Sequence, residues 1–172
     1  MPSEALVVFE EDLVRLRAIL DRLYADADAT AVFLVNRNGE AIAASGAVRD
    51  VDATSLASLA AGTVAATRGL AQMVGEREFS TLFHEGSRTH LHVTLVPGGA
   101  ILVLAFDERA TLGLVRLRVR RAAADLAEAL RTVTARRGSR DGLRDDPLAS
   151  WSDLTDEEVE ALFRAPGTGD AR

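Results

Sequence analysis

The stretch DATSLASLAAGTVAATRGLAQMVGE, residues 52–76, predicts one long helix and decides how the rest of the chain is interpreted. At about 100° per residue, its larger apolar side chains fall on one stripe, which we expect to be the core face. That stripe comprises Leu56, Leu59, Thr63, Ala66, Leu70, Met73 and Val74.

The opposite side of this helix carries small residues, where a solvent-exposed surface usually carries long charged ones. It holds Ser58, Ala61, Gly62, Ala65, Gly69 and Gln72, with Arg68 at its edge. An interior glycine costs about 1 kcal/mol relative to alanine, so two of them indicate that another backbone must come close. We therefore predict that a twin helix or a partner protein covers this side. The alternative is a helix buried all round in a larger core.

The remaining elements follow from hydrophobic periodicity and turn residues. We predict helices at 9–26 and 111–137 and strands at 31–36, 40–45, 78–86, 88–96 and 100–107. Asn38-Gly39 favours a hairpin turn, because both residues accept positive φ. Either Asp52 or Thr54 could cap the long helix, and Gly75 is a typical terminator. The order predicts an α+β domain with a five-stranded antiparallel sheet and helices packed on it.

Composition limits the classes of protein to consider. The 172 residues suffice for one domain and a tail, and a net charge of −6 argues against sequence-independent nucleic-acid binding. Without cysteine there is no disulfide framework and no thiolate ligand or nucleophile. The first residues do not resemble a signal peptide, and no apolar run approaches the ~20 residues that span a bilayer. We expect a cytoplasmic protein without membrane insertion.

The C-terminal part is predicted to be a separate unit. We predict a domain over 1–137, a flexible linker over 138–150 and an acidic docking segment over 151–172, in which Thr155 and Glu158 form the capping box of a short helix. The apolar edge of that segment consists of Trp151, Leu154, Val159, Leu162 and Phe163. So short a helix is marginal in water, which favours docking on a partner or on its own domain over a frayed tail. The last long helix is rich in arginine, so the acidic segment either contacts it or is simply solvated.

Candidate catalytic groups are few and poorly arranged. His90 and His92 have a spacing that binds metal, but no third ligand is evident. His84 and Glu85 are neighbours in an expected strand and point to opposite faces, while Ser55 lacks any sequence sign of a base, as does Ser58. No phosphate-binding glycine motif occurs. We therefore expect no catalytic residues, no cofactor and no metal, and a protein that is not itself an enzyme.

Several stretches together resemble the Roadblock/LC7 family, whose fold is profilin-like. They are VFLVNRNGEAIAASG (32–46), DATSLASLAAGTVAATRGLA (52–71), FHEG (83–86), VLAFDERATLGLVRLRVRRA (103–122) and, in the tail, SDLTDEEVEALF (152–163). The resemblance covers most of residues 5–137. It is strongest to the bacterial members that act on a small Ras-like GTPase of the MglA type.

The resemblance implies a homodimer whose long second helices lie side by side and form a platform for the GTPase. Mapped onto this chain, that interface comprises Ser58, Ala61, Gly62, Ala65, Arg68, Gly69 and Gln72. The expected function is activation of GTP hydrolysis without an arginine finger, by favouring the active switch conformation of the GTPase. The acidic C-terminal segment would be a second clasp, and the process would be cell polarity and gliding motility, with the protein concentrated at a cell pole.

Two other functions stay open. A scaffold of the same fold would recruit a GTPase or motor without changing hydrolysis, and the small-residue helix is equally compatible with it. A small-ligand sensor would need a pocket among the sheet and helices, and the low aromatic content of 5% weighs against it.

Overall fold

The computed structural model describes residues 10–49 and 51–141 of the chain. The elements are α1 (Glu10–Asp26), β1 (Ala31–Asn36), β2 (Ala41–Gly46), α2 (Ala53–Met73), β3 (Thr81–His84), β4 (His90–Val96), β5 (Ala100–Phe106) and α3 (Leu112–Asp141). The predicted order of three helices and five strands is confirmed. The strand expected at 78–86 is shorter than predicted, so Phe79 lies outside it.

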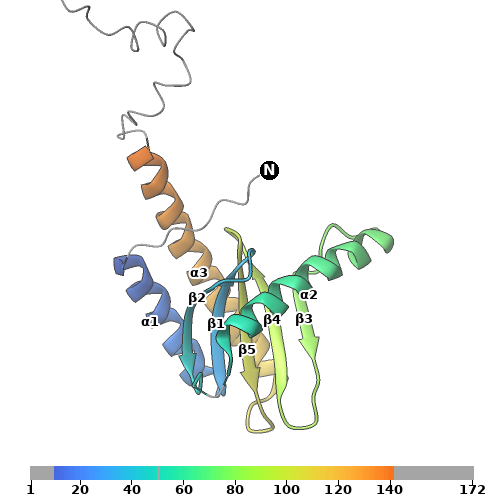
Figure 1. Ribbon diagram of the computed structural model, residues 1–172. Helices are drawn as coiled ribbons and strands as arrows, with labels where there is room; N and C mark the ends of the chain where they lie inside the picture. The colour runs from blue at the N-terminus through green and yellow to red at the C-terminus, as the bar shows by residue number, and fades with distance from the viewer. Residues whose placement is uncertain (1–9, 50, 142–172) are drawn as a thin grey trace, which may run out of the picture. The chain divides into compact units, whose positions relative to one another are not determined.

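All five strands form one antiparallel sheet in the order β2-β1-β5-β4-β3. Helix α2 lies across one face of this sheet, while α1 and the first part of α3 lie behind it, and the C-terminal end of α2 extends past the sheet edge at β3 (Figure 1). The predicted α+β fold, with helices packed on the sheet, is therefore confirmed.

The larger core lies between the sheet and the pair α1 and α3. Strand side chains such as Leu34, Leu102 and Leu104 are fully buried there, and Phe106 is nearly so. The apolar repeats of the two helices supply the other wall. They are Leu16, Leu20 and Leu23 from α1 and Val115, Val119, Ala122, Leu126 and Leu130 from α3. The apolar periodicity of both helices thus predicted their core faces correctly.

The smaller core, under α2, corrects the face that we assigned to that helix. Phe33, Val35 and Val103 of the sheet meet small side chains of α2, chiefly Ala57 and Ala60. The predicted stripe is mostly turned away: the large side chains on it that are strongly exposed are Leu59 (71%), Leu70 (56%), Met73 (84%) and Val74 (68%). The prediction failed because an apolar stripe indicates only that one side of a helix becomes buried. It does not tell whether the sheet of the same chain or another molecule buries that side. Alanine lets α2 lie close to the sheet, and the large side chains are left outside.

Both ends of α2 follow the sequence signals. The Asp52 carboxylate accepts hydrogen bonds from the backbone N–H groups of Thr54 and Ser55, at 3.1 Å each, and from the Ser55 hydroxyl at 2.6 Å. These bonds, led by the Ser55 hydroxyl, lower the pKa of Asp52. Asp52 is therefore the N-cap, and Gly75, at φ +81°, lies just beyond the C-terminal end.

The β1–β2 turn brings a glycine against α2. Gly39 has φ +84°, and a Cβ on it would lie 2.9 Å from the Ser58 Cα. Of the two turn residues that accept positive φ, Gly39 alone adopts it. The Asn36 side-chain oxygen instead accepts from the N–H groups of Asn38 and Glu40 and holds the turn.

The chain divides into two compact units, Met1–Thr134 and Ala135–Arg172. The first holds the sheet. Helix α3 runs to Asp141, four residues beyond its predicted end at 137, so residues 138–141 of the predicted linker are helical instead. The rest of the linker, 142–150, and the docking segment at 151–172 lie outside the described residues and stay predictions. No helix in the described ranges is long and apolar enough to cross a membrane.

Candidate surface on helix α2

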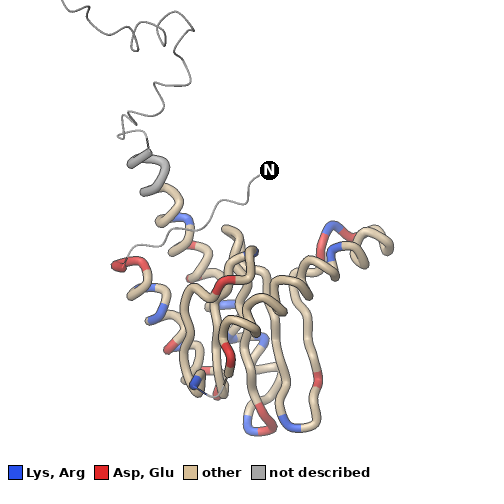
Figure 2. The backbone as a smooth tube through the Cα atoms, in the orientation of Figure 1, with Lys and Arg blue, Asp and Glu red and all other residues tan. Residues whose placement is uncertain are grey.

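The surface of α2 that faces away from the sheet carries two adjacent strips. The small-residue strip consists of Ser58, Gly62, Ala65, Gly69 and Gln72, all exposed. The apolar strip consists of Leu59, Ala66, Leu70 and Met73, also exposed. Charged residues are almost absent from α2, whereas they are frequent on α1 and in the turns between strands (Figure 2). A helix surface this poor in charge is typical of an interaction face.

The two glycines of the small-residue strip leave their surroundings open. A Cβ added at Gly62 or Gly69 would meet nothing within 4 Å. Within this chain, then, no neighbouring group requires glycine at either position, and the mid-helix cost remains uncompensated. Close approach of a backbone from another molecule would provide that compensation.

Polar groups border the small-residue strip at both ends. Arg68 is half-exposed and lies 3.6 Å from the Glu78 carboxylate, an exposed pair that contributes little stability. Ser58, at the other end, donates a long hydrogen bond of 3.4 Å to the Gly39 carbonyl. The exposed Gln72 adds an amide. Hydrogen bonds from these polar groups could fix the position of a partner that contacts the small residues.

Ala61 is the one residue of the predicted interface that turns toward the sheet. It is half-buried and packs against the core cluster beneath α2, so it marks the border of the small-residue strip. The structure brings the other six predicted residues together on the exposed side of one helix. Their assignment as a GTPase interface stays a prediction.

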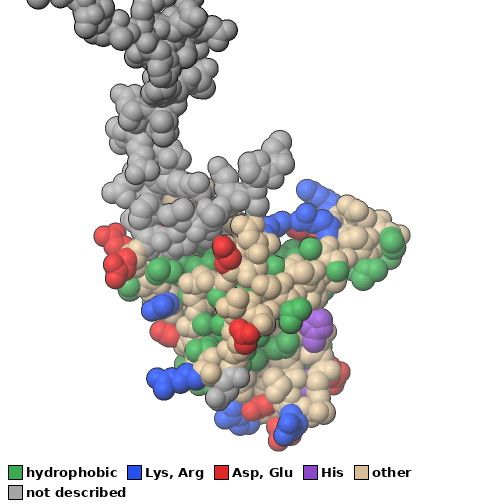
Figure 3. Space-filling model, viewed as in Figure 1, with side chains coloured by type: hydrophobic (Ala, Val, Ile, Leu, Met, Phe, Trp, Pro, Cys, Tyr) green, Lys and Arg blue, Asp and Glu red, His purple; other side chains and the backbone are tan. Residues whose placement is uncertain are grey.

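Sequence reasoning missed the apolar strip as a surface. Hydrophobic side chains gather at the projecting end of α2 (Figure 3), where Leu70, Met73 and Val74 are more than half exposed. Single exposed apolar side chains are common, but several together on one side of a helix mark an interaction site. The signal was present in the sequence as an unbroken apolar stripe, and it was assigned to the core.

The histidines do not assemble a catalytic or metal centre. His90 and His92 lie on one face of β4, as predicted, and His90 stacks among aromatic rings, 5.3 Å from Phe106 and 5.9 Å from Phe83. Burial, and then the charge of Arg116, lower the pKa of His92. Within the described ranges, no three His, Asp or Glu side chains come together as a metal site.

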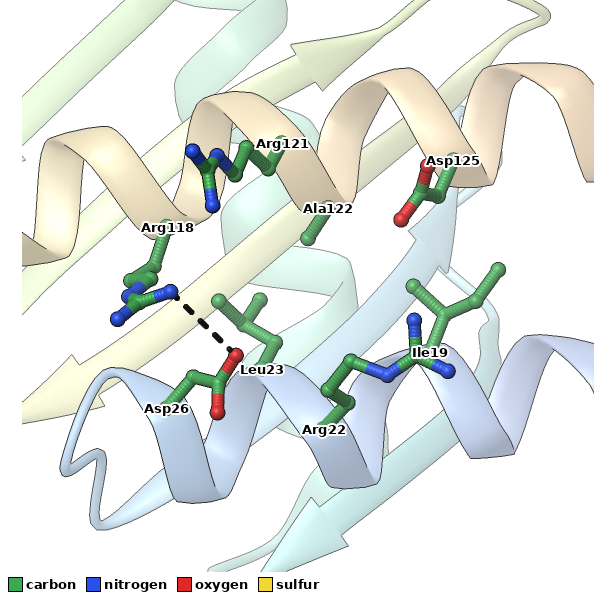
Figure 4. A pocket seen from close by; sticks show the side chains of 8 residues that line it. All are labelled: Ile19, Arg22, Leu23, Asp26, Arg118, Arg121, Ala122 and Asp125. Atoms are coloured by element: carbon green, nitrogen blue, oxygen red, sulfur yellow. Dashed lines mark ion pairs between the residues drawn. The ribbon is translucent and has the colours of Figure 1, made fainter.

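A small pocket of about 160 Å³ lies between α1 and α3 (Figure 4). Arg118 pairs with Asp26 at 3.7 Å across it, while Arg22, Arg121 and Asp125 line its sides. Cations and carboxylates are mixed there, so the pocket selects neither sign of ligand. We interpret this pocket as part of the polar contact between α1 and α3, not as a ligand site.

Comparisons with known proteins give this architecture a family. The Roadblock/LC7 domain model matches residues 16–106. Among solved structures, "Myxococcus xanthus MglB" is 46% identical, with a TM-score of 0.70, over 74% of this chain and 96% of that one. The gliding protein MglB from Thermus thermophilus is 34% identical, with a TM-score of 0.71, over 77% and 98%.

A further structure, described as "MglB with tetrameric arrangement", is also 34% identical, with a TM-score of 0.72, over 77% of this chain and 98% of that one. Among curated proteins no sequence matches. The family match spans more than half of the chain, and the identity to the Myxococcus xanthus protein extends over about three quarters of it. The chain belongs to the Roadblock/LC7 family.

Proposed function

We propose that this chain is a homodimeric GTPase-activating protein for a small Ras-like GTPase of the MglA type. It would bind the GTP-loaded GTPase, accelerate hydrolysis and thereby regulate cell polarity and gliding motility in the cytoplasm, concentrated at a cell pole. The observation that carries the proposal is the outer surface of α2, which has Arg68 as its only charged residue and carries two unconstrained glycines, in a chain 46% identical to "Myxococcus xanthus MglB".

The two strips of α2 suit two different contacts. The apolar strip, with Leu59, Leu70 and Met73, offers the large side chains that a permanent dimer interface buries. The small-residue strip offers close backbone approach with a few polar groups at its border, which suits a partner that binds and leaves. The structure described as "MglB with tetrameric arrangement" supports assembly of more than one copy.

Activation would act through the conformation of the GTPase. Arg68 is the only cation of α2, and it lies on the helix at the edge of the strip, 3.6 Å from the Glu78 carboxylate, rather than on a loop. In the proposed mechanism the small-residue strip binds the active switch conformation more tightly than the inactive one. That difference in affinity shifts the population toward the hydrolytically competent state.

The platform is tested by the double variant Ala65→Arg with Gly69→Arg. Two long cations would fill the close-approach surface, and because both positions are exposed we expect an unchanged fold and loss of GTPase binding in a pull-down. The matched control is Gly113→Arg with Ala124→Arg. Gly113 and Ala124 are exposed small residues of α3, so these substitutions add the same charge on a different helix. Retained binding by the α2 variant would disprove the platform.

The absence of an arginine finger is tested separately with Arg68→Ala. An arginine finger is worth about 10³–10⁵ in turnover, so its removal would abolish activation. We expect Arg68→Ala to reduce stimulated hydrolysis by less than about tenfold, through weakened binding alone. A loss of a thousandfold or more at saturating concentrations would assign Arg68 a direct catalytic role.

The alternative is a scaffold that recruits a GTPase or motor without changing hydrolysis. The same strips would serve it, so the deciding quantity is turnover rather than binding. The proposed clasp at Trp151, Leu154, Val159, Leu162 and Phe163 favours the regulator, because a scaffold needs no second contact.

Deleting 148–172 should spare the dimer, as measured by light scattering, and weaken the response of the GTPase. Loss of the dimer would show the tail to be structural.

A further inference from the structure

A second site lies on the other face of the sheet, away from α2. A cavity of about 570 Å³ opens between the β3–β4 edge of the sheet and the first turns of α3. It is large enough for a small organic ligand. Ser80 and Thr81 at its mouth are exposed, so the cavity is open to solvent.

Two guanidinium groups line the α3 side of this cavity. Arg116 and Arg120 are one helical turn apart and therefore lie on the same side of α3. Neither has an ion-pair partner among the described residues, whereas Arg118 and Arg131 of the same helix do. The described part of the cavity wall includes no acidic side chain. The local charge is therefore positive and uncompensated.

His92 lines the same cavity from β4 with an unsatisfied ring nitrogen. Only 3% of this residue is exposed, and its Nε2 has no hydrogen-bond partner among the described residues. The other ring nitrogen, Nδ1, lies 3.1 Å from the Thr94 hydroxyl. When that hydroxyl donates to Nδ1, the proton sits on Nε2, which becomes a free donor. A buried polar group left unpaired is costly, so it calls for a partner from outside the chain.

The combined chemistry selects an anion over a metal ion. Two arginines would repel a divalent cation, and the described wall offers no carboxylate to hold one. An oxyanion would instead meet two guanidinium groups, the His92 N–H and the hydroxyls of Ser80 and Thr81, all of which can donate. Guanidinium groups match the geometry of phosphate oxygens particularly well.

We propose that this cavity, which we term the β4–α3 cavity, binds a phosphate group, either as free inorganic phosphate or as part of a mononucleotide. The site is independent of the proposed GTPase platform, because α2 covers the opposite face of the sheet (Figure 1). It would give the domain a small-molecule ligand whose occupancy stabilises the β3–β4 edge against α3.

The test titrates inorganic phosphate, and separately adenosine and guanosine monophosphates, into the full-length protein by calorimetry in a chloride buffer. We expect saturable binding of inorganic phosphate at one site per chain. Nucleotides that bind at least about tenfold more tightly would identify the mononucleotide as the source of the phosphate group, and equal affinities would identify free phosphate.

The cavity variant is Arg116→Gln with Arg120→Gln. It should weaken binding by at least about tenfold and keep the thermal midpoint, because both side chains are exposed at the cavity wall. The matched control, Arg121→Gln with Arg131→Gln, removes the same charge from the same helix. Arg121 faces α1 in the other pocket (Figure 4), and Arg131 pairs with Glu128, so this control should bind as the native protein does.

A second readout follows His92 itself. The chain has three histidines, so its imidazole signals are few enough to assign by NMR with His84→Gln and His90→Gln. Phosphate should shift the His92 ring signals and leave those of the exposed His84 in place. The proposal is overturned if no saturable binding occurs, if both arginine pairs lose binding equally, or if the His92 signals do not respond.

Discussion

Replacing both glycines of the small-residue strip by alanine should strengthen the fold and weaken the partner contact at once. Gly62 and Gly69 are interior positions of α2 with nothing within 4 Å of an added Cβ. In the isolated domain the methyl groups meet no obstacle, and the gain in helix propensity is about 0.8–1.0 kcal/mol each. The double variant should therefore gain about 2 kcal/mol, or roughly 8 °C in thermal midpoint.

The contact should respond in the opposite direction. If another backbone lies against the glycines, each methyl group overpacks the contact, at a typical cost of about 1–3 kcal/mol. We expect the affinity for the GTP-loaded GTPase to fall at least about tenfold. Chemical denaturation measures the first effect. It should be repeated at several protein concentrations, because the unfolding midpoint of a dimer rises with protein concentration, and a loss of the dimer would remove that dependence.

Gly113→Ala on α3 is the matched control for this pair. Gly113 also has open space around its Cβ position but lies on a different helix, so its replacement should leave GTPase binding unchanged. A double variant Gly62→Ala with Gly69→Ala that gains stability and still binds the GTPase as tightly as the native chain would contradict a close contact at these glycines. In that case nothing approaches the glycines closely, and they reflect no interface.

Three further predictions concern the fold that supports the strips. Gly46→Ala should destabilise the domain by about 3 kcal/mol in denaturant unfolding, because φ is +92° and the new Cβ would lie 2.8 Å from the Thr30 carbonyl oxygen. Gly99→Ala is the control: φ is +91°, but the space around the new Cβ is open, so the loss of stability should be smaller. Asp52→Ala should lower the thermal midpoint by removing the cap of α2, while Asp52→Ser, which still caps, should restore most of it; equal midpoints would contradict the assignment. The pKa of His92 is lowered by burial and by Arg116, so the unfolded chain binds more protons below pH 6.5 and stability should fall as pH falls from about 7 to 5. In His92→Gln the free energy of unfolding should fall less steeply with pH than in the control His84→Gln. An equal slope in the two variants would show that His92 does not cause the fall.

The sequence predicted most of the fold because its signals were local. The apolar repeats of α1 and α3, the hairpin glycine at Gly39 and the Asp52 cap each determine structure within a few residues. Their combined order then restricts the topology to very few arrangements. The strands at 31–36 and 100–107 were predicted almost to the residue because each is a continuous buried apolar run.

The orientation of α2 could not be obtained the same way. Two of its sides lack charge, one lined by alanines such as Ala57 and one by large residues such as Leu70. Single-sequence periodicity assigns the larger side chains to the core. It contains no information about a second chain, which would cover them as effectively as the sheet does. The β4–α3 cavity was also beyond sequence reasoning, because β4 supplies His92 while α3 supplies Arg116 and Arg120.

The most direct test of the central claim is GTP turnover by the MglA-type GTPase from the same organism, measured with and without this protein. We expect a many-fold rise that saturates with added protein and disappears in Ala65→Arg with Gly69→Arg. If turnover stayed at its basal level while a pull-down still showed binding, the chain would be a scaffold rather than an activator. The claim of GTPase activation would then be wrong.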